Sequence, residues 1–337
     1  MGNELVTAVI ATYNYGRFVT EAIESVLAQT YPEVEIVVVD DGSTDDTQQR
    51  LAAYAGRIRS VYQANQSVAA ARNTGIQASR GSLIAFLDAD DLWHPQKLDL
   101  QVRYLAQHPE VGLVAVDRLR EGVAHWPVLH GASPRAQPIS LEELIIQPYF
   151  APSGVLVRKE CFARVGSFDT GLRNAEDYDM WIRIAAAFPI VKLEVPLWWY
   201  RVHGANKSYV PARQEAAGLR VLAKTFAKTG PLSKRFLLKR KAYSYAAYAA
   251  AQNFSTIGAE LPALLRLLRS FVLWPFPYSR REVSTALARP KKLFITLLRL
   301  LGALPKVVPQ TISRCPDSLE AVGPPSKGRS YEGREWA

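Results

Sequence analysis

The chain has 337 residues, of which 48% are hydrophobic, and it carries a formal net charge of +10 at pH 7. This length and apolar content suffice for one large hydrophobic core with an appendage, and no stretch approaches the ~20 apolar residues that a membrane-spanning helix needs. The two cysteines, Cys161 and Cys315, are too few and too far apart for a disulfide framework or a zinc site, which fits a reducing cytoplasm. We expect no secretory signal, because the first predicted strand begins almost at once.

The first hundred residues alternate short strands with helices. Strands are predicted at Leu5–Ala11, Glu35–Asp40, Ile58–Tyr62 and Ser82–Asp88, and helices at Phe18–Gln29, Asp45–Ala55, Val68–Ser79 and Pro95–Gln107. Such alternation implies parallel strands joined by right-handed crossovers, with helices on both faces of the sheet. The β-branched run Ile36–Val39 supports a strand that is buried on both sides. The sequence therefore predicts an α/β fold with a mostly parallel central sheet.

Three of these strands end in polar residues, namely Thr12, Tyr13 and Asn14, then Asp40 and Asp41, then Asp88, Asp90 and Asp91. We expect these ends to share one edge of the sheet, where ligands of open α/β sheets collect. Three crowded carboxylates repel one another unless a cation sits among them, and a hard divalent ion takes its other ligands from phosphates and water. An acidic turn capping the helix near Pro95 would explain the third segment alone, but the neighbouring strand ends favour a metal–diphosphate site.

The other polar side chains of this edge suit a nucleotide. Tyr13 offers a flat face to a base, and Asp40 and Asp41 can accept the imide N–H of a uracil or a ribose hydroxyl. Arg72 lies in the small-residue helix Val68–Ser79. Its guanidinium either reaches solvent or contacts base or phosphate.

Four segments together resemble the family 2 glycosyltransferases with the glycosyltransferase A fold, which is Rossmann-like: Val9–Asn14, Val38–Asp45, Ala71–Gly75 and Phe86–Asp91. The likeness runs from about Leu5 to Ser208. Members transfer a sugar from a nucleotide diphosphate donor, most often a UDP-sugar, with inversion at the anomeric carbon. The resemblance implies that Tyr13 and Asp41 hold the base beside Thr12 and Asp40, and that Arg72 supports the nucleotide. It also implies that Asp88 and Asp90 are the two ends of the Asp-x-Asp motif, which binds Mn²⁺ or Mg²⁺.

A second acidic pair, Glu176 and Asp177, falls in the first turn of a helix predicted after Asn174. The helix dipole favours anions there, so an ordinary acidic helix start is the alternative to a catalytic role. An inverting transfer needs a group that accepts the proton of the acceptor hydroxyl. The segment resembles the family's Glu-Asp motif, which implies that Asp177 is the general base and that Glu176 contacts or positions the acceptor.

The segment Trp198–Ser208 completes the resemblance. His203 matches a histidine that completes the metal shell or contacts the diphosphate in metal-dependent relatives, although a lone histidine can be purely structural. Arg201 and Lys207 could clamp the leaving diphosphate. Trp198 and Trp199 could stack on an acceptor sugar, with core packing expected for one of the two.

The region Ala212–Lys306 is strongly basic, with 18 lysines and arginines against three acidic residues. Amphipathic helices are predicted at Leu219–Phe226, Phe236–Phe254, Leu261–Leu273 and Leu293–Leu301. Such helices suit an anionic membrane surface, whereas a small bundle with solvated cations is the alternative. Nucleic-acid binding would use the same charge, but no recognition motif accompanies it.

The sequence thus predicts a catalytic, nucleotide-sugar-binding domain at residues 1–210, a basic helical region at 211–304, and a tail at 305–337 that we expect to be disordered. The enzyme would be cytoplasmic and peripheral on the inner face of the plasma membrane, serving cell-surface polysaccharide or glycan synthesis. It would add a single sugar to a saccharide or lipid-linked acceptor, because the Gln-x-x-Arg-Trp motif of processive members is absent. The alternatives are transfer to a polyprenyl phosphate and a non-catalytic membrane-binding protein on a transferase scaffold.

Overall fold

One nine-stranded sheet organises the first two hundred residues. The structure, a computed structural model, describes residues 4–119, 126–127, 129, 134–147, 150–201, 203, 210–278 and 288–305. Its strands are β1 (Val6–Thr12), β2 (Val34–Asp40), β3 (Arg59–Tyr62), β4 (Leu83–Asp88), β5 (Leu92–Trp93), β6 (Leu113–Arg118), β7 (Ala136–Ile139), β8 (Val155–Arg158) and β9 (Ile190–Trp199). They pair in the order β3-β2-β1-β4-β8-β6-β9-β5, with β7 on β9. Strands β1 to β4 are parallel, as predicted, and β8 joins the sheet antiparallel to β4 and β6.

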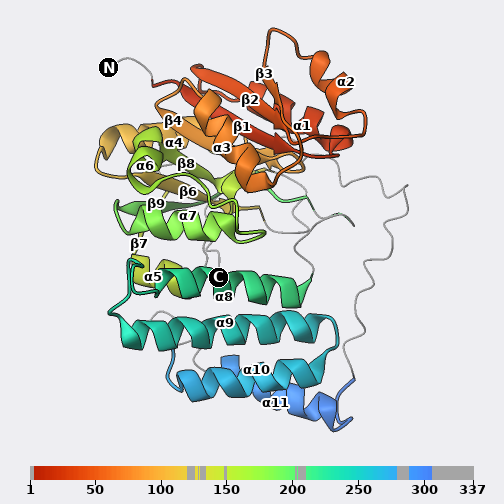
Figure 1. The fold of residues 1–337 in the computed structure, drawn as a ribbon, viewed down its shortest axis with the longest axis vertical. Coiled ribbons are helices and arrows are strands. Elements are labelled where there is room, and N and C mark those ends of the chain that lie inside the picture. Colours follow the sequence, from red (N-terminus) through yellow and green to blue (C-terminus); the bar gives the residue numbers. More distant parts are fainter. Residues whose placement is uncertain are drawn as a thin grey trace.

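Helices cover both faces of this sheet (Figure 1). They are α1 (Gly16–Leu27), α2 (Thr47–Ala52), α3 (Val68–Ala78), α4 (Lys97–Gln107), α5 (Leu141–Ile146), α6 (Lys159–Val165) and α7 (Glu176–Ala185), with a short 3₁₀ turn at Pro152–Gly154 before β8. All four helices predicted in the first hundred residues are present, within a few residues of the predicted ends. The mostly parallel α/β sheet predicted from the sequence is therefore confirmed.

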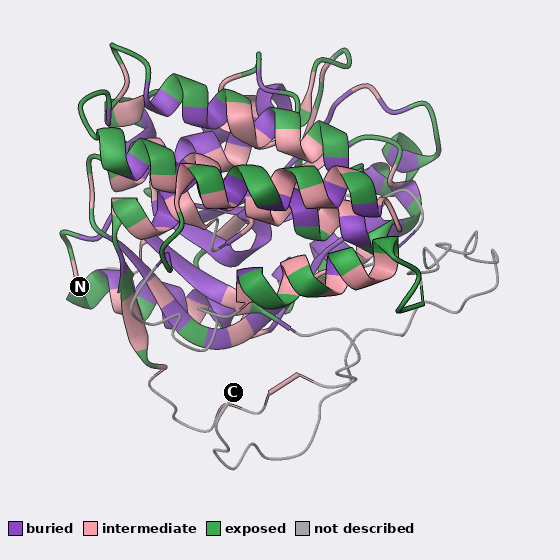
Figure 2. Ribbon diagram, turned by 90° about the horizontal axis from the view of Figure 1, so that it is seen from below, coloured by how far each residue is buried: buried purple, intermediate pink, exposed green. Residues whose placement is uncertain are grey.

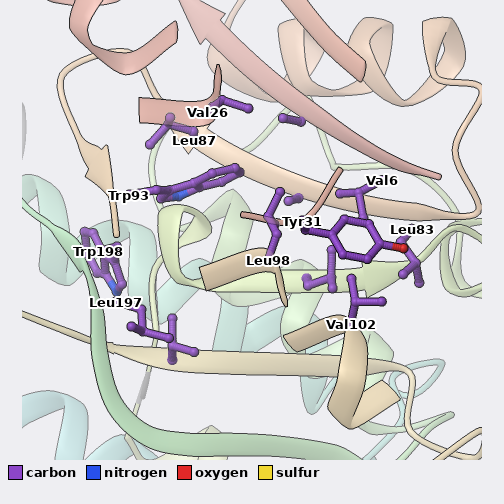
Figure 3. Close-up of a cluster of buried hydrophobic side chains, with 14 of the residues drawn as sticks. Val6, Val26, Tyr31, Leu83, Leu87, Trp93, Leu98, Val102, Leu197 and Trp198 are labelled. Carbon is purple, nitrogen blue, oxygen red and sulfur yellow. The ribbon is translucent and has the colours of Figure 1, made fainter. Parts of the chain in front are cut away.

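Alternate residues of β1 feed two separate hydrophobic cores. Ala8 and Ile10 pack in a cluster with α1 and α4, part of which is drawn in Figure 3. Val9 points to the opposite face and packs in a second cluster with α3 and α7. On that face Gly75 lets α3 approach β1 closely, because an added Cβ would lie 2.2 Å from a methyl group of Val9. This close packing brings α3, which carries Arg72, directly over the strand ends.

Four further helices stack beneath the sheet: α8 (Pro211–Thr225), α9 (Phe236–Thr256), α10 (Glu260–Leu273) and α11 (Ala288–Leu300) (Figure 1). Val221, Leu222 and Phe226 belong to the same hydrophobic cluster as Trp181 of α7, so the core continues across residue 210. The domain boundary there stays a prediction. Within the part of the chain that the structure describes, no helix combines the length and the apolar character that crossing a membrane requires. Nearly all of the predicted tail, from residue 306, lies outside the described residues.

Candidate active site

The ends of β1, β2 and β4 lie side by side at one edge of the sheet. In the parallel register Thr12 is opposite Asp40, and Ala11 is opposite Asp88. The strand order therefore brings together the three polar segments that the sequence predicts to share a site.

At the β2 end of this edge, two buried carboxylates stand beside an exposed ring. Asp41 accepts hydrogen bonds at Oδ1 from the Gln63 side chain (2.6 Å) and the Gln66 backbone N–H (3.1 Å). Asp40 accepts from the Ser43 backbone N–H at 2.9 Å, while its Oδ2 is buried and has no hydrogen-bond partner among the described residues. The Thr12 hydroxyl is likewise buried and has no hydrogen-bond partner among the described residues. Buried polar atoms without partners are rare in folded proteins, so these two atoms fit a site that a polar ligand completes.

Tyr13 is 39% exposed beside these carboxylates, and the loops around it are tied together. Asn14, in the left-handed region at φ 56°, donates its N–H to the Ser43 hydroxyl (2.9 Å) and accepts from the Thr44 N–H (2.7 Å). These bonds fix the turn after β1 against the turn after β2. Tyr13 is therefore held on a braced turn, with its ring available to a ligand.

The three aspartates after β4 have different surroundings. Asp91 is almost fully buried, and it accepts from the Ser153 hydroxyl (2.6 Å) and from the Arg201 backbone N–H (3.3 Å). Burial, followed by the charges of Asp90 and Asp88, raises the pKa of Asp91 well above its usual range. Burial also raises the pKa of Asp88, against the opposing effect of Arg72. The segment thus holds three closely spaced carboxyl groups, two of which have a raised pKa.

Asp90 and His203 supply two adjacent ligand atoms. The Asp90 Oδ2 lies 3.0 Å from the His203 Nε2, and both side chains are buried, with the imidazole against the rings of Tyr15 and Phe18. Within the described ranges, no three His, Cys, Asp or Glu side chains form a complete metal cage. The residues nevertheless fit a divalent ion held by one carboxylate and one imidazole, with phosphates and water as further ligands, because carboxylate oxygen and imidazole nitrogen are both ligands of such ions. Asp88, the other predicted ligand, has its Oδ1 bound by Arg72.

Arg72 joins the acidic segment to α7. It is buried, and its two terminal nitrogens lie 2.7 Å from the Asp88 Oδ1 and 2.7 Å from the Glu176 Oε1. The resemblance implies that this guanidinium supports the nucleotide. In the structure both of its ends are occupied by carboxylates, so its direct part is to hold Asp88 and Glu176 in place.

Asp177 stands at the start of α7, next to Glu176. Two residues without glycine's freedom, Asn174 (φ 90°) and Ala175 (φ 58°), adopt left-handed conformations just before the helix. Such backbone strain clusters at functional sites. Burial, followed by the charge of Glu176, raises the pKa of Asp177 to about 7, while Arg72 acts in the opposite direction. A carboxyl group that titrates near neutral pH is suited to accept and release a proton.

The other predicted site residues have different places. The Arg201 guanidinium is buried against Glu21 (2.6 Å) and the Asp90 carbonyl oxygen (3.2 Å), so it ties the end of β9 to α1 and its charge is already paired. Trp198 is 4% exposed and packs in the first core cluster (Figure 3), whereas Trp199 is half-buried. Lys207 lies outside the described residues.

Sequence reasoning missed two residues of this site. Ser153 donates to Asp91 and accepts from the Asp88 backbone N–H (3.2 Å), so it joins both acidic positions. Gln63 binds Asp41 from β3's end. Neither had a signal in the sequence, because each is a single polar residue whose partner is remote along the chain.

Comparison with known proteins decides the family. The model of the family "Glycosyl transferase family 2" matches residues 7–166. An uncharacterized glycosyltransferase of Rickettsia typhi is 30% identical over 216 residues, which are 62% of this chain and 68% of the relative. The chain belongs to glycosyl transferase family 2. The predicted family is thus confirmed for this chain.

One further relative and two solved structures are also similar to this chain. An uncharacterized glycosyltransferase of Nostoc sp. is 35% identical over 214 residues, covering 60% of this glycosyltransferase and 66%, slightly under two thirds, of the relative. Among solved structures, S. aureus TarS 1–349 in complex with UDP-GlcNAc has a TM-score of 0.55 at 17% identity, covering 88% of this chain and 92% of that chain. The mannosyltransferase PcManGT from Pyrobaculum calidifontis, in complex with GDP-Man and Mn²⁺, has a TM-score of 0.56 at 22% identity, covering 88% of each chain. At such identities the likeness shows the fold, which is the glycosyltransferase A fold.

Proposed function

We propose that this glycosyltransferase transfers a single sugar from a nucleotide-diphosphate donor to an acceptor hydroxyl with inversion, with Asp177 as general base and a divalent ion at Asp90 and His203. One observation carries the proposal. Arg72 bridges Asp88 of the acidic segment and Glu176 at 2.7 Å each, so one ion-pair network joins the proposed metal segment to the residue next to the proposed base, Asp177.

For the donor we propose a uridine diphosphate sugar. The unpartnered Asp40 oxygen and the Asp41 carboxylate are acceptors that suit the imide N–H of uracil or a ribose hydroxyl, and the exposed ring of Tyr13 can stack on the base. TarS has been solved with UDP-GlcNAc and PcManGT with GDP-Man. Both ligands are nucleotide-diphosphate sugars, which supports this donor class.

The proposed reaction is one displacement at the anomeric carbon. The bond from this carbon to the diphosphate oxygen breaks, and its electron pair leaves with the diphosphate as the acceptor oxygen bonds to the opposite face. Asp177 takes the acceptor's proton, and Glu176, fixed by Arg72, orients the acceptor. When bound, a divalent ion at Asp90 and His203 would neutralise the charge of the departing diphosphate.

For the acceptor we propose a saccharide or a lipid-linked saccharide in glycan synthesis, reached from the cytoplasmic face of a membrane. Trp199 is half-buried, and the Cζ atom of Arg201 lies 5.2 Å from the centre of its indole ring. This indole offers an aromatic surface for a sugar. The excess of cations in Ala212–Lys306 supports peripheral attachment to an anionic bilayer.

The test is a panel of UDP- and GDP-sugars, screened with Mn²⁺, with Mg²⁺ and with excess chelator. We expect at least one UDP-sugar to raise the melting temperature in a metal-dependent way and to be turned over. NMR of the product would then show an anomeric configuration opposite to that of the donor. Turnover that is unaffected by the chelator would contradict the metal, and a retained configuration would contradict the single displacement.

A further inference from the structure

The start of α9 and the end of α10 lie together and border a cavity of about 470 Å³, away from the strand ends. The hydrogen bonds from Arg240 to the backbone carbonyls of Val272 and Leu273 (both 3.1 Å) join the two helices here. The lining of this cavity includes the cations Lys234, Arg235 and Lys241 and the large apolar side chains Phe236, Leu237 and Trp274.

The charge around this cavity is mostly positive. Residues 216–259 contain eight lysines and arginines and no aspartate or glutamate. One acidic side chain, Glu142 of α5, reaches the cavity, where it pairs with Arg235. Lys241 lies near the ring of Trp274, 6.0 Å from its centre. Closely spaced ammonium and guanidinium groups are the usual binding partners of phosphate.

The surface beside the cavity is apolar. Phe236 and Leu237 are each 66% exposed, and Val272 is 75% exposed. The α10 residues Leu261, Leu265, Leu268 and Val272 recur at helical spacing and are all exposed, whereas Ala263, Leu267 and Ser270 are buried. In Figure 2, the view from the side of α10 and α11, the nearest helices carry long exposed faces. A solvent-exposed helix face usually carries polar residues, so an apolar stripe of this length marks an interaction site.

We propose that this surface, consisting of Lys234–Lys241 and the outer stripe of α10, rests on a lipid bilayer, and that the cavity takes the phosphate of an anionic lipid headgroup. This inference deepens the membrane attachment proposed above. A bilayer with anionic lipids offers phosphates for the cations and acyl chains for the leucines. A second copy of the chain would bring the same cations against each other, and nucleic acid would leave the leucine stripe exposed to water.

The proposed contact differs from the one the sequence suggests. Arg266 belongs to the basic helices, but it is paired with Glu215 at 2.6 Å and stacks on Phe254, so its charge is turned toward α8 and α9. The cavity cations lie instead at the start of α9, next to the most exposed apolar side chains.

The test is co-sedimentation of the full chain with phosphatidylcholine vesicles, with and without phosphatidylglycerol. We expect binding to the anionic vesicles that weakens with salt. Replacing Lys234, Arg235 and Lys241 by Gln should weaken it by about fivefold per cation, roughly a hundredfold together. The matched control replaces Arg164, Arg213 and Arg220 by Gln, which removes the same charge from α6 and α8 and should change binding by less than a few fold.

A second variant tests the apolar stripe. Leu265→Gln with Val272→Gln should weaken binding even at high salt, where electrostatic attraction is screened. At low ionic strength, matched with sodium chloride, inorganic phosphate should weaken the binding but not abolish it, since it competes for the cavity and cannot replace the acyl contact. Absence of binding to anionic vesicles, equal losses in the cavity and control variants, or complete release by phosphate where matched chloride releases nothing would overturn the proposal. So would a dimer in solution that the stripe variant converts to a monomer.

Catalysis is measured separately. The cavity variant should release nucleoside diphosphate from a soluble donor at the wild-type rate. A wild type that binds vesicles but turns over no nucleotide-sugar would contradict the proposed function and leave the lipid site standing. Turnover of a nucleotide-sugar without vesicle binding would contradict the lipid site and leave the proposed transfer reaction standing.

Discussion

Replacing Asp177 by Asn changes the one group to which we assign the acceptor's proton. Burial and the charge of Glu176 raise the pKa of this carboxyl to about 7. Since only the ionised form accepts a proton, activity should be present above this pKa and lost below it. With a pKa of about 7, roughly a tenth of the carboxyl is ionised at pH 6, so the wild-type rate there should be about tenfold below its plateau. A bound cation nearby would lower the pKa of Asp177 and with it the midpoint of the pH–rate profile. The metal concentration is therefore held fixed across the profile.

The amide introduced by Asp177→Asn has almost the same shape as the carboxylate but cannot take the proton. We expect kcat to fall by ~10²–10⁴ and the pH dependence between about pH 6 and 8 to disappear, with donor affinity unchanged. The assay follows release of nucleoside diphosphate over an acceptor-free background, using a panel of saccharide acceptors. The matched control is Asp179→Asn, the same chemical change two residues later. That side chain pairs with Arg183 (2.9 Å) and Lys224 (2.9 Å), so its loss should lower the melting temperature and leave the pH profile in place.

Two results would refute the assignment of the base. One is a kcat for Asp177→Asn within a few fold of the wild type. The other is a variant that is slow but keeps the wild-type inflection, because another group would then be titrating. In either case Glu176 would be tested next.

Three further changes have defined outcomes. Asp90→Ala should abolish metal-dependent turnover and weaken Mn²⁺ binding in titration calorimetry while the melting temperature is kept; unaltered Mn²⁺ affinity would contradict the ligand assignment. Arg72→Met leaves two carboxylates without their counter-ion and should cost about 3 kcal/mol in urea unfolding. It should also shift the midpoint of the pH–rate profile to higher pH, because Arg72 lowers the pKa of Asp177. An unchanged midpoint would refute the electrostatic effect of Arg72 on Asp177. Gly75→Ala should destabilise the fold by about 1–3 kcal/mol through the clash with Val9, and wild-type stability would show that the helix can shift freely.

Local patterns were enough to predict β1 to β4 and the edge that β1, β2 and β4 form. Each of β1, β2 and β4 is a short β-branched or apolar run that ends in polar residues, and parallel pairing is the usual result of strand–helix alternation. The shared edge follows from these two facts alone. The first half of α8 escaped prediction, because Pro211–Gly218 has no apolar stripe and becomes helical with the packing of Ala217, Val221 and Leu222.

Individual partners could not be predicted in the same way. The guanidinium of Arg72 meets carboxylates 16 and 104 residues away, so its chemical type was readable from the sequence but its contacts were not. Arg201 and Trp198 follow the same rule: the ion pair of Arg201 with Glu21 and the burial of the Trp198 indole depend on how β9 docks against α1 and β5. Residue chemistry predicts what a side chain can do, and packing decides which of those options is used.

The most direct test of the central claim is nucleoside diphosphate release from a UDP-sugar by the wild type, with Mn²⁺ and with excess chelator, next to Asp90→Ala under the same conditions. We predict release by the wild type with Mn²⁺, and release at background level both with chelator and in the variant. Equal release in all three samples would contradict a metal-assisted transfer at this edge of the sheet.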